Sequence, residues 1–500
     1  MLANISKSQK ITVMAGVMLA MLLSALDQTI VATALPKIVE ELQGLDHLSW
    51  VFTSYMLAST VTVPIYGKLS DIYGRKGFYL AGIVIFLIGS ILSGLSQNMT
   101  QLILFRAVQG IGGGAMMANS FAIIADLFPP RERGRWQGLL GGVFGLASVL
   151  GPFLGGWLTD NASWRWNFYI NIPVGLLALA AIWTFMPKIV SDIKDRSIDY
   201  AGAMFLILGL VPLLLALIWG GNEYAWNSIQ VISLFIFSLV SLVTFGFIET
   251  KVKEPILPLS LFKNRIFSVS VLITFLSAMG MFGAILYIPL FAQGVLGISA
   301  TDSGTILTPL MFGLIISSII SGQIISRTGK YKWLAVIGMA VVTFAMFLLS
   351  QVTAGTTQTE LVIRMILMGI GLGITMPIFT IAVQNAFDHS QIGVVTASTQ
   401  LFRSIGGTVG VAIMGSVLNN ALINNTRSFP SNPPQALALS IGHIFFFGTF
   451  FMATALVASF FLKEITLRAS NQKRGILEEA GVELAEEVGE FPAKSEPELR

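Results

Sequence analysis

The sequence predicts an all-α membrane protein, and both its composition and its pattern support this class. Of its 500 residues, 54% are hydrophobic and only 11% are charged, whereas soluble domains carry roughly 25% charged residues. The apolar residues form continuous runs of about 18 or more, which is long enough for a helix to cross a bilayer. An outer-membrane barrel would show shorter, alternating segments instead.

Fourteen of these runs are predicted to span the membrane. Their approximate bounds are 11–34, 49–67, 78–97, 102–125, 136–158, 167–186, 200–220, 230–248, 266–291, 304–325, 333–351, 360–384, 394–421 and 440–462. An even number of spans places both termini on the same side of the membrane.

The positions of the basic residues predict the orientation of the spans. With the N-terminus inside, twenty-four of the thirty Lys and Arg residues lie on the inner side, and only Lys37, Arg165 and Arg427 lie outside. The remaining three, Arg106, Arg364 and Arg403, fall within spans. This bias predicts a multi-pass protein of the cell (cytoplasmic) membrane with both termini in the cytoplasm.

Two pairs of similar segments indicate that the chain contains an internal duplication. Residues 110–128 resemble residues 369–387 without a gap, and the glycine and charge spacing of 67–75 recurs at 322–330. Duplicated halves around a central cavity are typical of secondary transporters. We predict an N-terminal six-helix half (1–196), two inserted transmembrane helices (197–252), a C-terminal six-helix half (253–463) and a cytoplasmic tail (464–500).

The composition also argues against several other classes of protein. The chain has no cysteine, so a thiol-ligated metal site is not expected, and its basic residues lie in short loops, which does not indicate nucleic-acid binding. An embedded nucleophile, metal cluster or acid pair is not recognisable, so we do not expect an enzyme. Nor does a phosphate-binding loop follow a strand, so we expect no cofactor and an ion gradient as the energy source.

Asp27 is the main candidate for a functional residue. It is the one acid placed well inside a span, and an ionisable group at that depth is costly and usually functional. Counted from Ile11, Asp27 lies about 24 Å into the membrane, and Arg106 enters from outside to about the same depth. Burial favours the neutral carboxyl and Arg106 favours the carboxylate, which suits a group that exchanges protons. A static interhelical ion pair is the alternative.

Five motifs in order resemble the signatures of the major facilitator superfamily. They are LDQTIVATALP (26–36), GKLSDIYGRK (67–76), RAVQGIGGG (106–114), GLASVLGPFLGG (145–156) and WRWNFYINIPVG (164–175). Their combination, over residues 11 to about 463, resembles the fourteen-span drug:proton antiporter family of multidrug efflux type. The resemblance implies the major facilitator fold, with proton coupling at Asp27 and Arg106.

The second of these motifs is a candidate gate. Gly67 and Gly74 are expected to permit a tight turn between antiparallel spans, and Asp71 and Arg75 to make charge contacts that latch the inner face, with Asp126 as a partner of Arg75. The resemblance implies that this motif stabilises the outward-facing state. Its basic residues also fix topology, and the two roles are compatible.

The fourth motif is expected to form a flexible contact in the fifth span. Its small residues and proline leave one helical face nearly bare; they are Gly145, Gly151, Pro152, Gly155 and Gly156. Packing alone would explain the glycines, but the resemblance associates the motif with export.

The sequence gives the least information about which residues contact the substrate. Methionine and aromatic side chains re-pack around varied lipophilic ligands and attract organic cations, although most such residues here face lipid or other helices. Our candidates are Gln28, Met116, Asn119, Phe282, Tyr287 and Gln293.

Together these features predict a proton-coupled antiporter that exports lipophilic or cationic drugs and toxic compounds by alternating access. Monovalent cations and neutral amphiphiles are favoured over divalent cations. The expected partners are a small lipophilic or cationic substrate, protons and membrane lipids. The protein is expected to be a monomer. The alternatives are a dedicated exporter or flippase of an endogenous metabolite or lipid, and a non-transporting sensor on the same fold.

Overall fold

The computed structural model describes residues 6–43, 48–187, 197–221, 223–298, 307–465 and 467. The predicted tail therefore lies outside the described residues from position 468 onward. Within the described residues the chain is helical, and its one β-type contact is an isolated bridge between Gly220 and Tyr224.

The helices follow one another with short connections. In chain order they are α1 (Lys7–Leu42), α2 (Leu48–Tyr73), α3 (Arg75–Leu95), α4 (Met99–Leu127), α5 (Pro130–Asn161), α6 (Trp166–Tyr169), α7 (Asn171–Phe185), α8 (Tyr200–Trp219), α9 (Ile229–Glu249), η3 (Leu259–Lys263), α10 (Arg265–Gly294), α12 (Thr308–Thr328), α13 (Lys332–Ser350), α14 (Gln358–Ala386), η4 (His389–Gln391), α15 (Ile392–Ser428) and α16 (Pro433–Phe460).

Thirteen helical segments of the described chain are long and apolar enough to cross a membrane. They account for thirteen of the predicted spans, with α6 and α7 forming one of them. The remaining predicted span, 49–67, falls on α2, which is 26 residues long but carries serine and threonine along much of its length. The structure is thus an all-α membrane protein, roughly consistent with fourteen spans.

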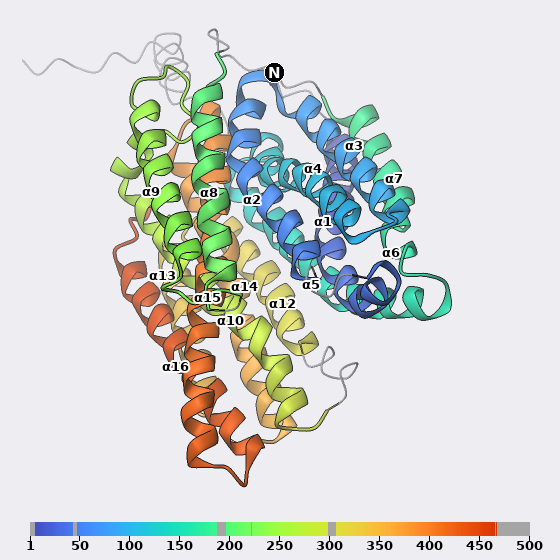
Figure 1. The fold of residues 1–500 in the computed structure, drawn as a ribbon. Helices are drawn as coiled ribbons and strands as arrows, with labels where there is room; N and C mark the ends of the chain where they lie inside the picture. The colour runs from blue at the N-terminus through green and yellow to red at the C-terminus, as the bar shows by residue number, and fades with distance from the viewer. Residues whose placement is uncertain are drawn as a thin grey trace, which may run out of the picture.

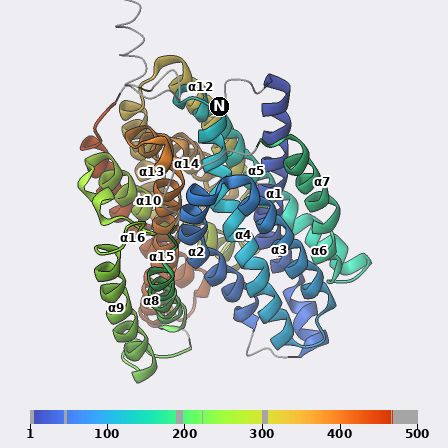
Figure 2. The same cartoon turned by 90° about the horizontal axis from the view of Figure 1, so that it is seen from above.

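The helices form two groups with a pair of helices beside them. Helices α1 to α7 lie together on one side, and α10 to α16 lie on the other (Figure 1). Helices α8 and α9 pack against each other at the edge of the second group, and α8 contacts α2 and α15 (Figure 2).

The two ends of the bundle can be told apart by the helix termini. We call the end where α1 begins and α16 ends the basic face, and the opposite end the far face. At the basic face the Gln9 side chain donates to the Phe185 carbonyl at 2.8 Å, and Arg265 donates to the Phe461 carbonyl at 3.1 Å. Hydrogen bonds therefore connect the beginning of one helix to the end of another at this face, because successive helices of the bundle run in opposite directions.

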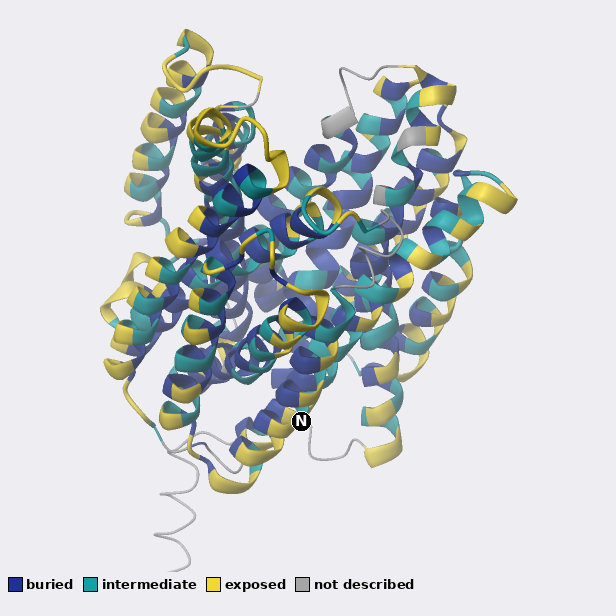
Figure 3. Cartoon of the chain, turned by 90° about the horizontal axis from the view of Figure 1, so that it is seen from below, coloured by how far each residue is buried: buried dark blue, intermediate teal, exposed yellow. Residues whose placement is uncertain are grey.

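Apolar side chains fill each group separately. One buried cluster is built from α10 and α12 to α16, and two others are built from α1 to α7. A further cluster joins α8 and α9 to α2, α10 and α15. Figure 3 shows buried residues concentrated inside the bundle and exposed residues at helix ends and on the outer helices.

The two groups are in close contact near the basic face. Helix α5 packs along α12, and α2 packs along α15. A Cβ added to Gly134 would lie 2.9 Å from the Gly322 carbonyl oxygen, so these helix backbones nearly touch. The Gln137 amide donates to the Gln384 side chain at 3.1 Å across the same boundary.

Candidate functional site

The Asp27 carboxylate lies at the meeting point of three helices. It forms an ion pair with Arg106 of α4 and accepts hydrogen bonds from Gln109 Nε2 of α4 at 2.8 Å and Asn171 Nδ2 of α7 at 3.3 Å. The structure therefore brings Asp27 and Arg106 together, as the depth estimate predicts. Both carboxylate oxygens are engaged, since Arg106 contacts Oδ2 and the two amides contact Oδ1.

Helix α2 holds the Arg106 guanidinium from the other side. Arg106 Nε donates to the Val51 carbonyl at 3.1 Å, and the guanidinium carbon lies 4.5 Å from the centre of the Tyr55 ring, within the range of a cation–π contact. The Nη2 atom of Arg106 is buried without a hydrogen-bond partner. The guanidinium is thus tightly placed yet not fully satisfied, which raises the free energy of this arrangement.

Glycines of α3 and α4 explain how this cluster assembles. A Cβ on Gly113 would lie 2.5 Å from the Tyr55 hydroxyl, and one on Gly89 of α3 would lie 2.5 Å from the Gln109 backbone nitrogen. Any larger residue at these positions would push α2 or α3 away from α4. The glycine-rich run after Arg106 therefore serves close helix packing, which sets the position of Arg106 and Gln109.

The cluster is closed to solvent in this conformation. Asp27, Arg106, Gln109 and Asn171 are all 0% exposed. A buried ion pair is costly to break by removing one partner, at about 3–5 kcal/mol. The Asp27 carboxylate therefore has no contact with solvent in this conformation.

Two members of the cluster, Gln109 and Asn171, were not among the residues predicted from the sequence. Both lie in the quoted motifs, at 106–114 and 164–175. Gln109 lies three residues after Arg106, which places it on the same helical face, and this spacing could have identified it. Asn171 had no such signal, because its place depends on the break between α6 and α7 at Ile170.

The predicted gate residues meet at the basic face. Arg75 pairs with Asp71 at 2.8 Å and also with Asp126. The Asp71 carboxylate accepts hydrogen bonds from the backbone N–H groups of Gly393 at 3.1 Å and Val394 at 2.8 Å. Gly393 and Val394 are the second and third residues of α15, and N–H groups in the first turn of a helix lack intrahelical partners. A carboxylate from the other half therefore caps this helix.

The expected role of Gly67 in a turn is wrong. Gly67 lies within α2, which continues to Tyr73, and a Cβ there would collide with Ala397 and lie 3.0 Å from the Gly393 carbonyl oxygen. Its function is close approach between the halves. Gly74 does make the turn, with φ of 96°, a conformation that favours glycine.

The expectation that the α5 glycines form one bare face is also wrong. A Cβ on Gly145 would lie 2.7 Å from the Ile315 side chain of α12, whereas Gly151 and Gly155 face Thr29 and Thr33 of α1. An added Cβ on Gly156 meets nothing within 4 Å. The cause is helical geometry, since six residues separate Gly145 from Gly151 and place them on different sides of the helix. Pro152 lies inside α5, as expected.

The six candidate substrate residues occupy varied surroundings. Met116 and Asn119 are fully buried, and the Asn119 Oδ1 atom has no hydrogen-bond partner. Phe282 lies against Gly407, and the Tyr287 hydroxyl lies near Gly415. Gln28 donates to the Ser24 carbonyl at 3.2 Å, and Gln293 lies near the far end of α10. These residues do not form one cluster with Asp27, and their role in substrate binding stays a prediction.

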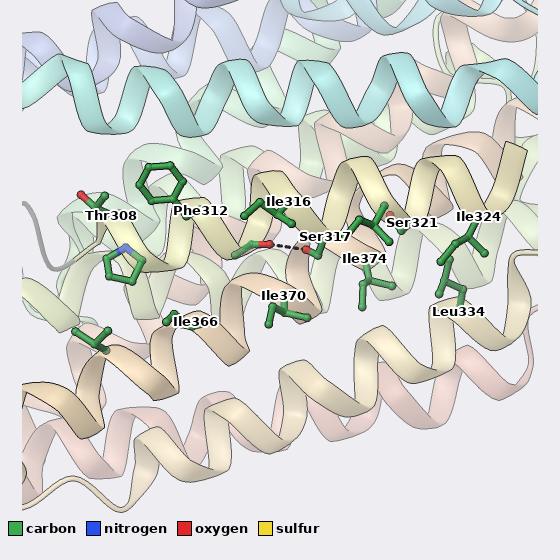
Figure 4. Close-up of a pocket in the computed structure, with 14 residues that line it drawn as sticks. Thr308, Phe312, Ile316, Ser317, Ser321, Ile324, Leu334, Ile366, Ile370 and Ile374 are labelled. Atoms are coloured by element: carbon green, nitrogen blue, oxygen red, sulfur yellow. Dashed lines mark hydrogen bonds between the residues drawn. The ribbon is translucent and has the colours of Figure 1, made fainter.

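A large apolar groove lies on the outer surface of the second group of helices. Its volume is about 910 Å³, and residues of α12, α13 and α14 line it (Figure 4). Phe312 and Ile316 on its wall are more than half exposed. The Ser317 hydroxyl donates to the Gly313 carbonyl at 2.6 Å and so offers the groove little polarity. These features suit a surface in contact with lipid chains.

The comparisons with known proteins agree with this architecture. The sequence profile of the Major Facilitator Superfamily matches residues 17–411, and the chain belongs to this superfamily. It is therefore a multi-pass membrane transporter and not an enzyme, as the motifs predict.

Individual relatives place the chain within the superfamily. It is 46% identical over 413 residues to the multidrug transporter protein MdtP of Bacillus subtilis, covering 83% of this chain and 76% of the relative. It is 44% identical over 412 residues to multidrug resistance protein 3 of the same organism, covering 82% and 80%. The chain is thus similar to transporters of multidrug efflux type.

Solved structures share the fold at low sequence identity. The human organic anion transporter MFSD10 (TETRAN) superposes with a TM-score of 0.63 at 18% identity, covering 89% of this chain and 99% of the other. The proton:xylose symporter XylE superposes with a TM-score of 0.60 at 14% identity, covering 89% and 96%. At these identities the likeness concerns the fold alone.

Proposed function

We propose that this protein is a proton-coupled antiporter of the cytoplasmic membrane that exports lipophilic or cationic compounds by alternating access. The observation that carries the proposal is the Asp27 carboxylate, which is fully buried within the membrane-spanning bundle and engaged by Arg106, Gln109 and Asn171. Its multidrug relatives support a drug as the exported compound. The proton gradient supplies the energy, without a cofactor.

Protonation of Asp27 would change the packing of α1. A neutral carboxyl loses its Coulomb attraction to Arg106 and leaves a buried cation without its counter-ion. That state is unfavourable unless the helices move or water enters. Proton uptake thus favours a conformation in which the site is open.

The contacts of α1 with α5 offer a route from Asp27 to the boundary between the halves. Thr29, two residues after Asp27, lies against Gly151, and its hydroxyl donates to the Ala147 carbonyl at 3.0 Å. Helix α5 in turn packs on α12, where Gly138 lies against Ser318. A shift of α1 would therefore be transmitted to the boundary that opens and closes in alternating access.

The conformation described here corresponds to the outward-facing state in this proposal. With the basic face assigned to the cytoplasm by the positive-inside bias, the contacts at Asp71 and Gly134 close the cytoplasmic side. Substrate would leave from the far face, and protons would enter from there.

The test uses inside-out vesicles with an acidified lumen. Added substrate should collapse the pH gradient in vesicles with the unaltered protein, and Asp27→Asn should abolish this exchange. Glu41→Gln is the matched control, because it removes a carboxylate from the same helix that pairs with Arg165 in an exposed position. Normal exchange by Asp27→Asn would favour a static ion pair, and substrate movement without proton flux would refute antiport.

A further inference from the structure

Arg403 is an intramembrane cation for which the described residues of the second half supply no counter-ion. Among the described residues it takes part in none of the ion pairs or hydrogen bonds, and it is partly buried on α15. Arg106 in the first half has Asp27, so the two halves differ in this respect. A cation in the membrane without a partner is costly and calls for a function.

The sequence explains the missing counter-ion. Between residues 265 and 460 the acids are Asp302, Glu360 and Asp388. Asp302 lies outside the described residues, between α10 and α12 in the sequence. Glu360 caps the start of α14 at the far face, and Asp388 is exposed beyond its other end. In the described helices of this half, no carboxylate lies at the depth of Arg403.

Arg403 lies close to the middle of the membrane. It is nine residues, or about 14 Å, from Val394, whose N–H contacts Asp71 at the basic face. It is thirteen residues, or about 20 Å, from Ser416, which accepts a hydrogen bond from Trp226 in the far-face loop between α8 and α9. Transporters built from internal repeats bind their substrates near this depth.

Arg403 lines a small cavity whose wall carries one hydroxyl group without a hydrogen-bond partner and one with only a weak contact. The cavity has a volume of about 30 Å³ and lies among α10, α14 and α15, which neighbour one another in Figures 1 and 2. Thr274 on its wall is buried, and its hydroxyl has no hydrogen-bond partner. The Ser277 hydroxyl has only a weak contact, 3.6 Å to the Met339 sulfur. The Thr274 hydroxyl is thus a free donor in the same cavity as the guanidinium, and the Ser277 hydroxyl can exchange its weak contact for a better acceptor.

Close packing of α10 on α15 holds these groups together. A Cβ on Gly410 would lie 2.5 Å from the Met279 Cα atom, and one on Gly406 would collide with the Phe275 carbonyl. Glycine at these two positions therefore brings the α15 backbone onto α10, one and two turns beyond Arg403. Arg403 and Thr274 line the same cavity as a consequence of this packing.

We propose that Arg403, Thr274 and Ser277 form an anion subsite that binds the carboxylate or sulfonate group of an amphiphilic substrate. A volume of about 30 Å³ is about one water's share of the liquid, so the cavity has room for an oxygen atom of the anionic group. Arginine binds planar anions through paired hydrogen bonds. Met281, Met376 and Phe379 complete the wall and offer an adaptable apolar surface for the lipophilic body.

This inference rests on the proposed export function and refines its substrate class. The Asp27 carboxylate is closed off by its own hydrogen bonds, so an organic cation gains no free carboxylate there in this conformation. Arg403 instead favours a lipophilic anion, or a zwitterion whose anionic group reaches the cavity.

The test compares two fluorescent probes that differ by one sulfonate. These are 1-anilinonaphthalene-8-sulfonate and its uncharged parent N-phenyl-1-naphthylamine, whose proton-dependent uptake is measured in energised inside-out vesicles. Arg403→Gln should lower uptake of the sulfonate by roughly 10- to 100-fold, the loss expected for charge-assisted hydrogen bonds. Uptake of the parent compound should change less than about twofold. Arg403→Lys should retain part of the sulfonate uptake, because it keeps the charge and loses the paired geometry.

Each other outcome has a definite meaning. Equal loss of both probes in Arg403→Gln would assign Arg403 a structural role and overturn the subsite, as would unchanged sulfonate uptake. If the unaltered protein exchanges the parent compound for protons but ignores the sulfonate, the subsite fails and the antiport proposal stands. If it moves the sulfonate in an Arg403-dependent way without proton flux, the antiport proposal fails and the subsite stands. Thr274→Val, which removes only a hydroxyl, should reduce sulfonate uptake several-fold and spare the parent compound.

Discussion

The contact of Asp71 with α15 allows a quantitative prediction about the closed basic face. Asp71→Asn keeps the size of the side chain but removes its charge. The variant loses the ion pair with Arg75 and the charge at the N-terminus of α15. Charge-assisted hydrogen bonds contribute about 1.5–3 kcal/mol and charge at a helix end up to about 2 kcal/mol. Because Asn still accepts one hydrogen bond, we expect the closed state to lose about 2 kcal/mol, or on the order of 30-fold in population.

The absence of native cysteine makes this change directly measurable. Ala122 of α4 is fully buried and clusters with Ile392 of α15 near the basic face. Ala122→Cys therefore introduces a single thiol that a membrane-impermeant maleimide reaches from the basic face only when the halves separate. In inside-out vesicles, Asp71→Asn should raise the labelling rate by roughly 30-fold.

The control removes a different carboxylate from the same face. Asp388 is exposed and lies five residues before Gly393, so Asp388→Asn should leave the labelling rate within about twofold, as surface charges contribute little. An unchanged rate in Asp71→Asn would refute the idea that this carboxylate holds the halves together.

Three further predictions concern helix contacts and the hydrogen bonds of Asp27. Gly67→Ala should increase thiol labelling in the same assay, because its Cβ collides with Ala397. Adding Ala397→Gly in the same chain should reverse the increase. A lack of reversal would show that the Gly67–Ala397 contact does not control the opening. Gly151→Ala should impair transport, because its added Cβ collides with Thr29. Gly156→Ala has open space around its Cβ, so it should leave transport intact and gain up to about 1 kcal/mol of helix stability. Equal effects of the two variants in transport and thermal unfolding assays would refute this assignment. Gln109→Leu should lower the thermal stability by about 1–3 kcal/mol, because one Asp27 oxygen loses a hydrogen bond, and an unaltered unfolding midpoint would speak against that bond.

The sequence predicted the fold class and the central ion pair for physical reasons. Apolar run length identifies membrane helices because the bilayer fixes the length required. Counting residues from each membrane face placed Asp27 and Arg106 at one depth, and the structure places them in contact. The proton-coupling role of this pair and the proposed domain boundaries stay predictions.

The sequence could not predict which sides of the helices face each other. Gly67 was expected in a turn because glycine is common there, but α2 continues past it. The glycines of α5 were assigned to one face, although Gly145 contacts α12 and Gly151 contacts α1. Such assignments depend on the rotation of each helix within the bundle, which sequence spacing in a single helix does not fix.

The surroundings of Arg403 likewise could not be predicted from the sequence. Its place within a span was evident from the sequence. Its lack of a counter-ion among the described residues and the cavity that it shares with Thr274 became visible only from the packing of α10 on α15. A polar residue within a span thus identifies a candidate, and the surrounding helices determine what it can bind.

The central claim is that Asp27 is the group that exchanges a proton for substrate. Its most direct test is proton release by the purified transporter in weakly buffered detergent solution after substrate is added. We expect proton release from the unaltered protein and from the Glu41→Gln control, and none from Asp27→Asn. Undiminished proton release from a folded Asp27→Asn variant would contradict this claim.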